Sequence, residues 1–334
     1  MTVKSNKWGI IAAGWFAFFT TSTNGADTGE QAALRAELSE IKYKIIFETD
    51  RDGNWELYTV NADGSEPRNL TRTPDQNELY PHCSSDGRKI CFVVDEQKES
   101  AGEKQRVRNV YFMNIDGTGR TLVAENAADP CWNPEGSAIA YTSRKTSRYG
   151  ITDYHTRGIF IYELRSRTTK QIPNRSIMHA YAVDWSPDGN WFVYTVHQAM
   201  GFGHAVVAMD TDGTRIRPLT PIGITGCRPD FSPDSKRLCW VKDDQHICIT
   251  DFNVGEGHPS PAMRTLVGVD EKHEVYHPDW SPDAKYIAFS YGSGEEMYGG
   301  TGEWQICVIR SEGGPYVQIT SSGCDKEPDW IPVP

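Results

Sequence analysis

Hydrophobic residues in this chain come in short runs rather than in long amphipathic stretches. The runs at 44–47, 90–93, 191–194 and 306–309 are rich in β-branched and aromatic residues, and Gly, Pro, Asn and Asp cluster between them. Runs of this length bounded by turn residues are typical of strands joined by hairpins. The pattern therefore predicts an all-β protein.

One seven-residue frame recurs along most of the chain. Its clearest copy, at 183–189, reads Val-Asp-Trp-Ser-Pro-Asp-Gly and is followed by the apolar run at 191–194. The aromatic position of the frame recurs at 83, 132, 185, 231, 280 and 330, so the period is close to 50 residues. A period of this length built from short strands predicts a β-propeller. The six copies predict six blades, each a four-stranded antiparallel sheet.

The order of the strands predicts how the ring closes. The first strand, from residue 44, follows no copy of the frame, while the last copy, at 328–332, has no strand after it. We therefore expect the C-terminal strand at 328–331 to become the innermost strand of the first blade. Closure of this kind removes an exposed sheet edge.

The N-terminal part predicts two further regions. Residues 1–26 are expected to be an export signal peptide, because Lys4 and Lys7 precede an apolar stretch at 8–19 that small residues follow. Such a stretch is too short to span a bilayer comfortably, so we expect cleavage near Ala26; a retained anchor is the alternative. Residues 27–43 form a short helical lead-in, since the stretch at 28–40 is rich in helix formers, and 44–334 form the propeller. Export predicts a periplasmic or secreted protein with no membrane insertion after cleavage.

Net charge and cysteine positions bear on the class of partner and on the presence of disulfides. The formal net charge is −11, whereas nucleic-acid binding normally needs a basic patch, so we expect no nucleic-acid partner. Most of the eight cysteines stand where sister copies carry apolar residues, which predicts small buried side chains. Cys239 and Cys248 flank a hairpin turn at 242–245 and would face each other across it. A disulfide between them and two free thiols both remain open.

The frame resembles a known repeat type. The Trp-Ser-Pro-Asp-Gly turn, the strand after it, and the Asp-Gly-Ser turn before Leu-Thr resemble the TolB-type propeller repeat over nearly all of 44–334. TolB is a periplasmic member of the Tol–Pal envelope complex that binds the peptidoglycan-associated lipoprotein, and it carries a mixed α/β domain before its propeller. Only about 18 residues separate residue 26 from the first strand, so we expect that domain to be missing here. The resemblance implies the fold, and an envelope or secreted protein as partner of a monomeric chain.

The mouth of the central channel is the first candidate site. The inner strand of each blade begins with the frame, so the residue before its proline is expected near the entrance. These residues differ between copies: Tyr80, Asp129, Ala182, Arg228, His277 and Glu327. Such a ring could hold a small polar ligand or a metal; the alternative is a solvated channel whose charges pair with one another.

The loops between the second and third strands form the second candidate site. Four of these loops are long, at 95–109, 144–158, 197–204 and 291–303, and they leave on the same face as the channel mouth. Long loops gathered on one face of a repeat fold are where binding surfaces usually lie. We expect this face to present the aromatic residues Tyr149, Tyr154, Phe202, Tyr298 and Trp304.

Two patterns suggest catalytic or metal-binding sites, but neither is expected to form one. The segment from His273 to His277 matches the zinc-protease pattern His-Glu-x-x-His, but that chemistry requires a helix. Pro278 follows directly and the segment enters an inner strand, which disfavours a helix. The aspartates of the frame recur in most copies, so we expect them to serve the architecture by hydrogen-bonding the backbone in the turns: Asp184, Asp230, Asp279 and Asp329.

The sequence predicts a binding protein rather than an enzyme. We expect a protein-binding or scaffolding module of the cell envelope that binds through the channel-mouth face, with no cofactor. The alternative comes from a second resemblance, because TolB-type repeats are similar to those of oligogalacturonate lyases. That resemblance implies a divalent metal held by His277, with His273 as a further candidate ligand and Arg228 as the basic residue.

Overall fold

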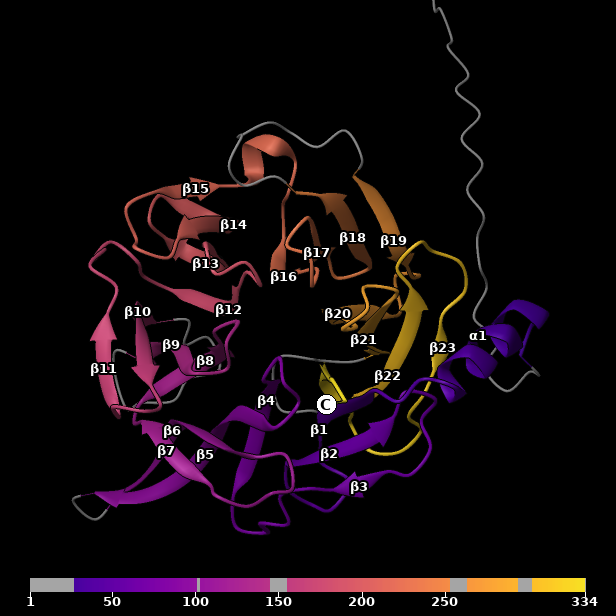
Figure 1. The fold of residues 1–334 in the computed structure, drawn as a ribbon, viewed down its shortest axis with the longest axis horizontal. Helices are drawn as coiled ribbons and strands as arrows, with labels where there is room; N and C mark the ends of the chain where they lie inside the picture. Colours follow the sequence, from indigo (N-terminus) through magenta and orange to yellow (C-terminus); the bar gives the residue numbers. More distant parts are fainter. Residues whose placement is uncertain (1–26, 101–102, 145–154, 253–262, 294–301, 334) are drawn as a thin grey trace, which may run out of the picture.

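The computed structural model describes residues 27–100, 103–144, 155–252, 263–293 and 302–333. The predicted signal peptide lies outside the described residues. In the described part of the chain, six four-stranded antiparallel sheets surround a central axis (Figure 1). The expected six-bladed all-β propeller is thus confirmed.

Each blade takes its strands in order from the axis outwards. Blade 1 contains β24 (Lys326–Ile331), β1 (Lys44–Thr49), β2 (Glu56–Asn61) and β3 (Arg68–Asn69); blade 2 contains β4 (Asn77–Cys83), β5 (Lys89–Ser100), β6 (Glu103–Asn114) and β7 (Thr121–Ala124). Blade 3 contains β8 (Ala127–Trp132), β9 (Ala138–Arg144), β10 (Thr156–Glu163) and β11 (Thr168–Gln171); blade 4 contains β12 (Ala180–Trp185), β13 (Trp191–Ala199), β14 (Phe202–Asp210) and β15 (Ile216–Pro218). Blade 5 contains β16 (Cys227–Phe231), β17 (Arg237–Asp243), β18 (His246–Asp251) and β19 (Arg264–Gly268); blade 6 contains β20 (Glu274–Trp280), β21 (Tyr286–Ser293), β22 (Glu303–Arg310) and β23 (Val317–Gln318). A 3₁₀ turn, η1 (Thr220–Ile222), leads from blade 4 to blade 5.

The ring closes as the strand order predicts. Strand β24 pairs antiparallel with β1, so that Trp330 lies opposite Ile45. The last strand of the chain is therefore the innermost strand of the first blade, beside strands that are almost 300 residues away in sequence.

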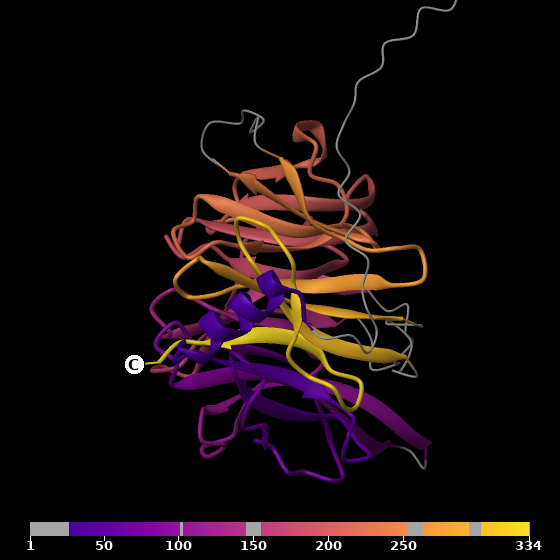
Figure 2. The ribbon, with the colours of Figure 1, turned by 90° about the vertical axis from the view of Figure 1, so that its right-hand side faces the viewer.

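A helix covers the seam where the ring closes. Helix α1 (Gly29–Ser39) begins with a capping box in which Thr28 and Gln31 exchange hydrogen bonds. Its buried Leu34 and Leu38 pack against apolar residues of blades 1 and 6, and Figure 2 shows the helix lying across the outside of these blades. No helix among the described residues has the length and apolar character needed to cross a bilayer.

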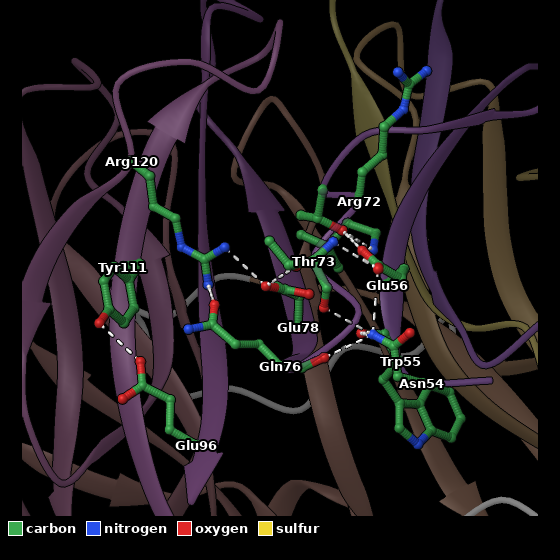
Figure 3. A network of polar contacts seen from close by, with 12 residues as sticks. Asn54, Trp55, Glu56, Arg72, Thr73, Gln76, Glu78, Glu96, Tyr111 and Arg120 are labelled. Carbon is green, nitrogen blue, oxygen red and sulfur yellow. Dashed lines mark hydrogen bonds and ion pairs between the residues drawn. The ribbon is translucent and has the colours of Figure 1, made fainter. Parts of the chain in front are cut away.

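A polar network fixes the connection from blade 1 into the inner strand of blade 2 (Figure 3). Thr73 donates its backbone N–H to Glu56 Oε1 (2.8 Å) and its hydroxyl to Glu78 Oε1 (2.6 Å). Arg120 of blade 2 lies 2.8 Å from the same Glu78 oxygen. Because Glu56 and Glu78 are buried, these bonds hold the connection and with it the start of β4, which carries Tyr80.

The cysteines are buried and free. All eight lie within the described residues and none forms a disulfide, which confirms the prediction of small buried side chains. A Cys239–Cys248 bridge is wrong, because Cys239 lies opposite Ile249 and Cys248 opposite Trp240. Strand β17 runs to Asp243 and β18 starts at His246, so the turn is shorter than the expected one at 242–245. The resulting register is offset by one residue from the expected one, which places the two thiols on opposite faces of the sheet.

Candidate functional site at the channel mouth

The residue before the frame's proline adopts the same unusual conformation in all six blades. Its φ lies between 47° and 53° at Tyr80, Asp129, Ala182, Arg228, His277 and Glu327, a region that L-residues rarely occupy. At each position the ladder between first and second strands shifts register. Proline has no N–H to donate to a neighbouring strand, which favours a bulge there. Blade 4 forms the same bulge with Val183 in place of proline.

The six bulges surround a cavity of about 120 Å³ at the centre of the ring. The six bulged residues line it together with the residues that follow them in the frame. The repeat therefore brings together side chains that the sequence places almost 250 positions apart. That a ligand binds among them stays a prediction.

Three of these side chains form a charged cluster. Oε1 of Glu327 lies 2.7 Å from Nε2 of His277 and 3.0 Å from Nη1 of Arg228. The Arg228 guanidinium also lies 5.9 Å from the centre of the Tyr276 ring. Blades 5, 6 and 1 thus each contribute one member. The charged side chains pair with one another, as in the alternative that was predicted for the channel.

His277 is held from behind by a serine. Its Nδ1 lies 3.0 Å from the Ser290 hydroxyl, and that hydroxyl also accepts the backbone N–H of Glu327 (3.2 Å). The arrangement contains serine, histidine and glutamate, but Ser290 has no exposed surface. Ser290 therefore orients His277 and cannot meet a substrate as a nucleophile.

Strand β1 adds a carboxylate that sequence reasoning missed. Glu48 is buried, and its Oε2 accepts the backbone N–H of Tyr80 (2.8 Å) while Oε1 lies 4.0 Å from Nζ of Lys326. Burial raises the pKa of Glu48 to about 7 against the opposing charge of Lys326, and the charge of Glu327 adds to the rise. A group with a pKa of about 7 thus contacts the backbone of Tyr80, one of the residues that line the cavity.

In blade 3, Asp129 is held by neutral donors, and in blade 2 a cation lies over the Tyr80 ring. Asp129 accepts hydrogen bonds from the Thr142 hydroxyl (2.8 Å) and the Ala182 N–H (3.1 Å), and burial raises the pKa of Asp129. Arg108 lies 5.2 Å from the centre of the Tyr80 ring.

The recurring aspartates join neighbouring blades. The carboxylates of Asp184, Asp230, Asp279 and Asp329 accept the backbone N–H groups of Phe231, Trp280, Trp330 and Cys83, respectively, at 2.9–3.0 Å. The prediction that they serve the architecture is confirmed, but their expected place in the turns is wrong. The turns use a second set, Asp86, Asp188, Asp234 and Asp283, which accept hydrogen bonds from the serine two residues earlier.

The inter-blade aspartates also line the cavity. Burial raises the pKa of Asp230 well above its usual range, and the charges of Asp279 and Asp184 act in the same direction. His82 takes the aspartate's place in blade 2, where its Nδ1 lies 3.7 Å from Asp329, and burial lowers the pKa of His82.

The aromatic residues expected on the loop face divide into three groups. Tyr149, Tyr154 and Tyr298 lie outside the described residues. Phe202 is partly buried against the core of blades 3 and 4. Trp304 is fully buried, so its expected place on the surface is wrong: the strand β22 turns it towards Tyr276, whose ring centre lies 5.9 Å away.

The two histidines considered as metal ligands have other contacts. Nδ1 of His273 lies 2.7 Å from Asp270 on an exposed turn, and both ring nitrogens of His277 lie within 3.0 Å of protein oxygens. Among the described residues, no three His, Cys, Asp or Glu side chains converge in an arrangement able to hold a metal ion. The contacts on both ring nitrogens do not fit His277 as a metal ligand, and a ligand role for His273 stays a prediction.

Comparisons with known proteins identify the type of propeller. No family model matches the chain. TolB from Acinetobacter baumannii aligns with a TM-score of 0.64 and 18% identity, covering 90% of this chain and 70% of that one. The chain is a TolB-like six-bladed β-propeller. The prediction that TolB's amino-terminal domain is missing stays a prediction.

Two further proteins are similar to this chain, one in structure and one in sequence. The structure of a nidogen/laminin complex aligns with a TM-score of 0.58 and 10% identity, covering 86% of this chain and 98% of that one. Dipeptidyl-peptidase 5 of Porphyromonas gingivalis is 24% identical over 286 residues, covering 70% of this chain and 40% of that protein. This TolB-like propeller therefore spans less than half of the curated relative it matches.

Proposed function

We propose that this TolB-like propeller is a protein-binding module that acts in the cell envelope or as a secreted protein. We propose further that its channel mouth binds an extended segment of a protein partner. The observation that carries the proposal is the set of six bulges. They direct one side chain from each blade at a single cavity, and those side chains are the part of the frame that differs between copies.

The size and polarity of the cavity favour a peptide over a whole small molecule. Ligand pockets for drug-sized molecules usually enclose about 300–1,000 Å³, whereas this cavity encloses about 120 Å³. One side chain or one chain end of a partner would fill it. Arg228 and Glu327 would meet polar groups of that segment, and the loop-bearing face around the mouth would contact the rest of the partner.

The comparisons agree with a protein-binding role without naming a partner. One solved structure of similar fold is a nidogen/laminin complex, which contains two different proteins. TolB from Acinetobacter baumannii is another solved structure of similar fold. The lyase alternative has no specific observation in its favour, since His277 is held by Ser290 and Glu327.

Filling the cavity tests the proposal. Ala182 is the smallest of the six bulged residues, so Ala182→Trp would occupy the cavity while keeping the backbone conformation, and Arg228→Ala would remove a polar contact. Glu66→Trp is the matched control, because Glu66 also has a positive φ (55°) but lies exposed in the turn between β2 and β3, on the opposite face.

The measurement is quantitative capture of proteins from an envelope extract by the purified, immobilised variants. Ala182→Trp is expected to reduce capture at least tenfold, and Glu66→Trp is expected to capture as wild type. Equal capture by both tryptophan variants, with unchanged melting temperatures, would overturn the proposal.

A further inference from the structure

Four histidines that are dispersed in sequence gather at the rim of blades 3 and 4. His155 directly precedes β10, His179 directly precedes β12, His197 lies near the end of β13 and His204 near the start of β14. In an antiparallel blade all four positions are at the loop-bearing end. We call these four residues the histidine cluster.

The imidazole rings of the cluster are in contact in pairs. The ring centres of His155 and His179 are 4.9 Å apart and the planes are inclined by 67°. His197 and His204 are direct cross-strand partners, with ring centres 5.4 Å apart and planes inclined by 74°. Edge-to-face imidazoles this close can turn one nitrogen each towards a common point.

The first pair has the feature that prepares a histidine for a metal. Nδ1 of His179 lies 3.0 Å from the backbone carbonyl oxygen of His197. A carbonyl only accepts hydrogen bonds, so in the neutral ring Nδ1 carries the proton and Nε2 keeps the lone pair. Histidines that bind metals usually donate their other ring N–H in this way, which fixes both the tautomer and the ring orientation.

The backbone around His179 is held firmly in an unusual conformation. His179 has φ of 53°, its N–H donates to the carbonyl of Thr156 (2.9 Å), and its carbonyl accepts the N–H of His197 (3.2 Å). Non-glycine residues persist in this region only where the surroundings enforce it, and they are frequent at functional sites.

The second pair is already engaged. His204 Nε2 lies 2.7 Å from the Tyr181 hydroxyl, and the Tyr181 and His204 rings are stacked, with centres 6.3 Å apart. Of this pair, His197 supports His179 through its backbone carbonyl, whereas the His204 side chain contacts Tyr181 and takes no part in that support.

We propose that His155 and His179 bind a divalent transition-metal ion of the borderline class that imidazole favours, such as Cu²⁺, Ni²⁺ or Zn²⁺. Imidazole nitrogen is a suitable ligand for each of these ions. The protein supplies two ligands and water completes the coordination, in keeping with the absence of a third converging His, Cys, Asp or Glu among the described residues. The site lies on the rim and is separate from the channel cavity of the proposed function.

Titration of the untagged full chain with Ni²⁺ or Cu²⁺, followed by calorimetry, tests the proposal. Wild type is expected to bind one ion at His155 and His179, and His155→Gln and His179→Asn are each expected to weaken binding at least tenfold. Asparagine is chosen at 179 because it tolerates positive φ better than most residues. His204→Gln is the matched control and is expected to bind as wild type.

A spectroscopic readout separates coordination from a change in fold. Electron paramagnetic resonance of the Cu²⁺-loaded protein is expected to show coupling to two imidazole nitrogens, and His179→Asn is expected to lose it while its metal-free melting temperature is unchanged. Loss of binding in His204→Gln with retention in His155→Gln would overturn the assignment. Equal binding by wild type and both ligand variants would overturn the site itself.

Discussion

At the scale of single residues, backbone and side chain have separate tasks in this propeller. The left-handed bulge recurs with six different side chains, so the frame fixes where the side chain points and the residue type fixes its chemistry. The bulge is held by the N–H of the bulged residue, which donates to Glu48, Thr195 or Ser290 on the second strand of the preceding blade at Tyr80, Arg228 and Glu327, respectively. These three acceptors are the support that makes a strained conformation persist.

Glu48 makes the free energy of unfolding depend on pH. Its pKa is about 7 in the folded protein, compared with a usual value of 4.5, so the folded state binds its proton more tightly than the unfolded state. This contribution to the free energy of unfolding is fully present below about pH 4.5 and is lost as the pH rises through 7. A shift of this size corresponds to about 3 kcal/mol.

We therefore predict that Glu48→Gln has a flatter stability profile than wild type. In urea unfolding between pH 5 and pH 8, wild type is expected to lose about 2–3 kcal/mol more than the variant. Glu271→Gln, at an exposed position, serves as control and is expected to follow wild type. The same slope in wild type and Glu48→Gln would contradict the assignment.

At the scale of elements, local sequence explains most strands, and packing explains the rest. The hairpin between β17 and β18 shows the limit, because its turn lies at 244–245 and the register beyond it places Cys248 opposite Trp240 instead of Cys239. Helix α1 shows the opposite case. Its capping box and helix formers are local, but it stays on the propeller because Leu34 and Leu38 are buried and because Arg310 donates two hydrogen bonds to Glu37 (2.8 and 2.9 Å).

The docking of α1 predicts a measurable contribution to stability. Leu38→Ala is expected to lower the free energy of unfolding by about 2–4 kcal/mol, because it leaves a cavity in the seam between blades 1 and 6. Leu122→Ala makes the same chemical change at a side chain that is 42% exposed and is expected to cost less than about 0.5 kcal/mol. Similar losses in the two variants in urea unfolding would show that α1 does not support the ring.

At the scale of the whole molecule, the ring is joined by contacts that no single repeat contains. The inner strands are connected by aspartate-to-backbone hydrogen bonds in four blades, and one of them crosses the closure, where Asp279 of blade 6 accepts the N–H of Trp330 in β24. Burial raises the pKa of Asp279 well above its usual range, and the charge of Asp329 adds to this. The Asp279 oxygen that accepts the Trp330 N–H therefore stabilises the closure, whereas the negative charge of Asp279 destabilises the folded protein.

This separation predicts different outcomes for two substitutions at the closure. Asp279→Asn keeps an acceptor for the Trp330 N–H and removes the charge, so it is expected to be at least as stable as wild type at pH 8. Asp279→Ala leaves that buried N–H without its acceptor and is expected to lose about 1–3 kcal/mol. Thermal and urea unfolding measure both; equal destabilisation by the two variants would show that the charge itself is needed.

The candidate site was only partly visible in the sequence, for a physical reason. The six bulged residues could be predicted because each occupies the same position in a repeat. Glu48, Ser290 and Lys326 could not, because each occupies a position that differs from blade to blade and becomes significant only through its neighbour across the ring. The histidine cluster was missed for the same reason, since the sequence shows four separate histidines.

The sequence by itself determined the strands, the period, the number of blades and the closing strand, because these follow from local turn chemistry repeated at a fixed spacing. Tertiary structure alone decided the register of the β17–β18 hairpin, the burial of Trp304, and the pairing of Glu327 with His277 and Arg228. Those outcomes depend on which side chains meet across blade boundaries, and such contacts join residues whose separation in sequence carries no periodic signal.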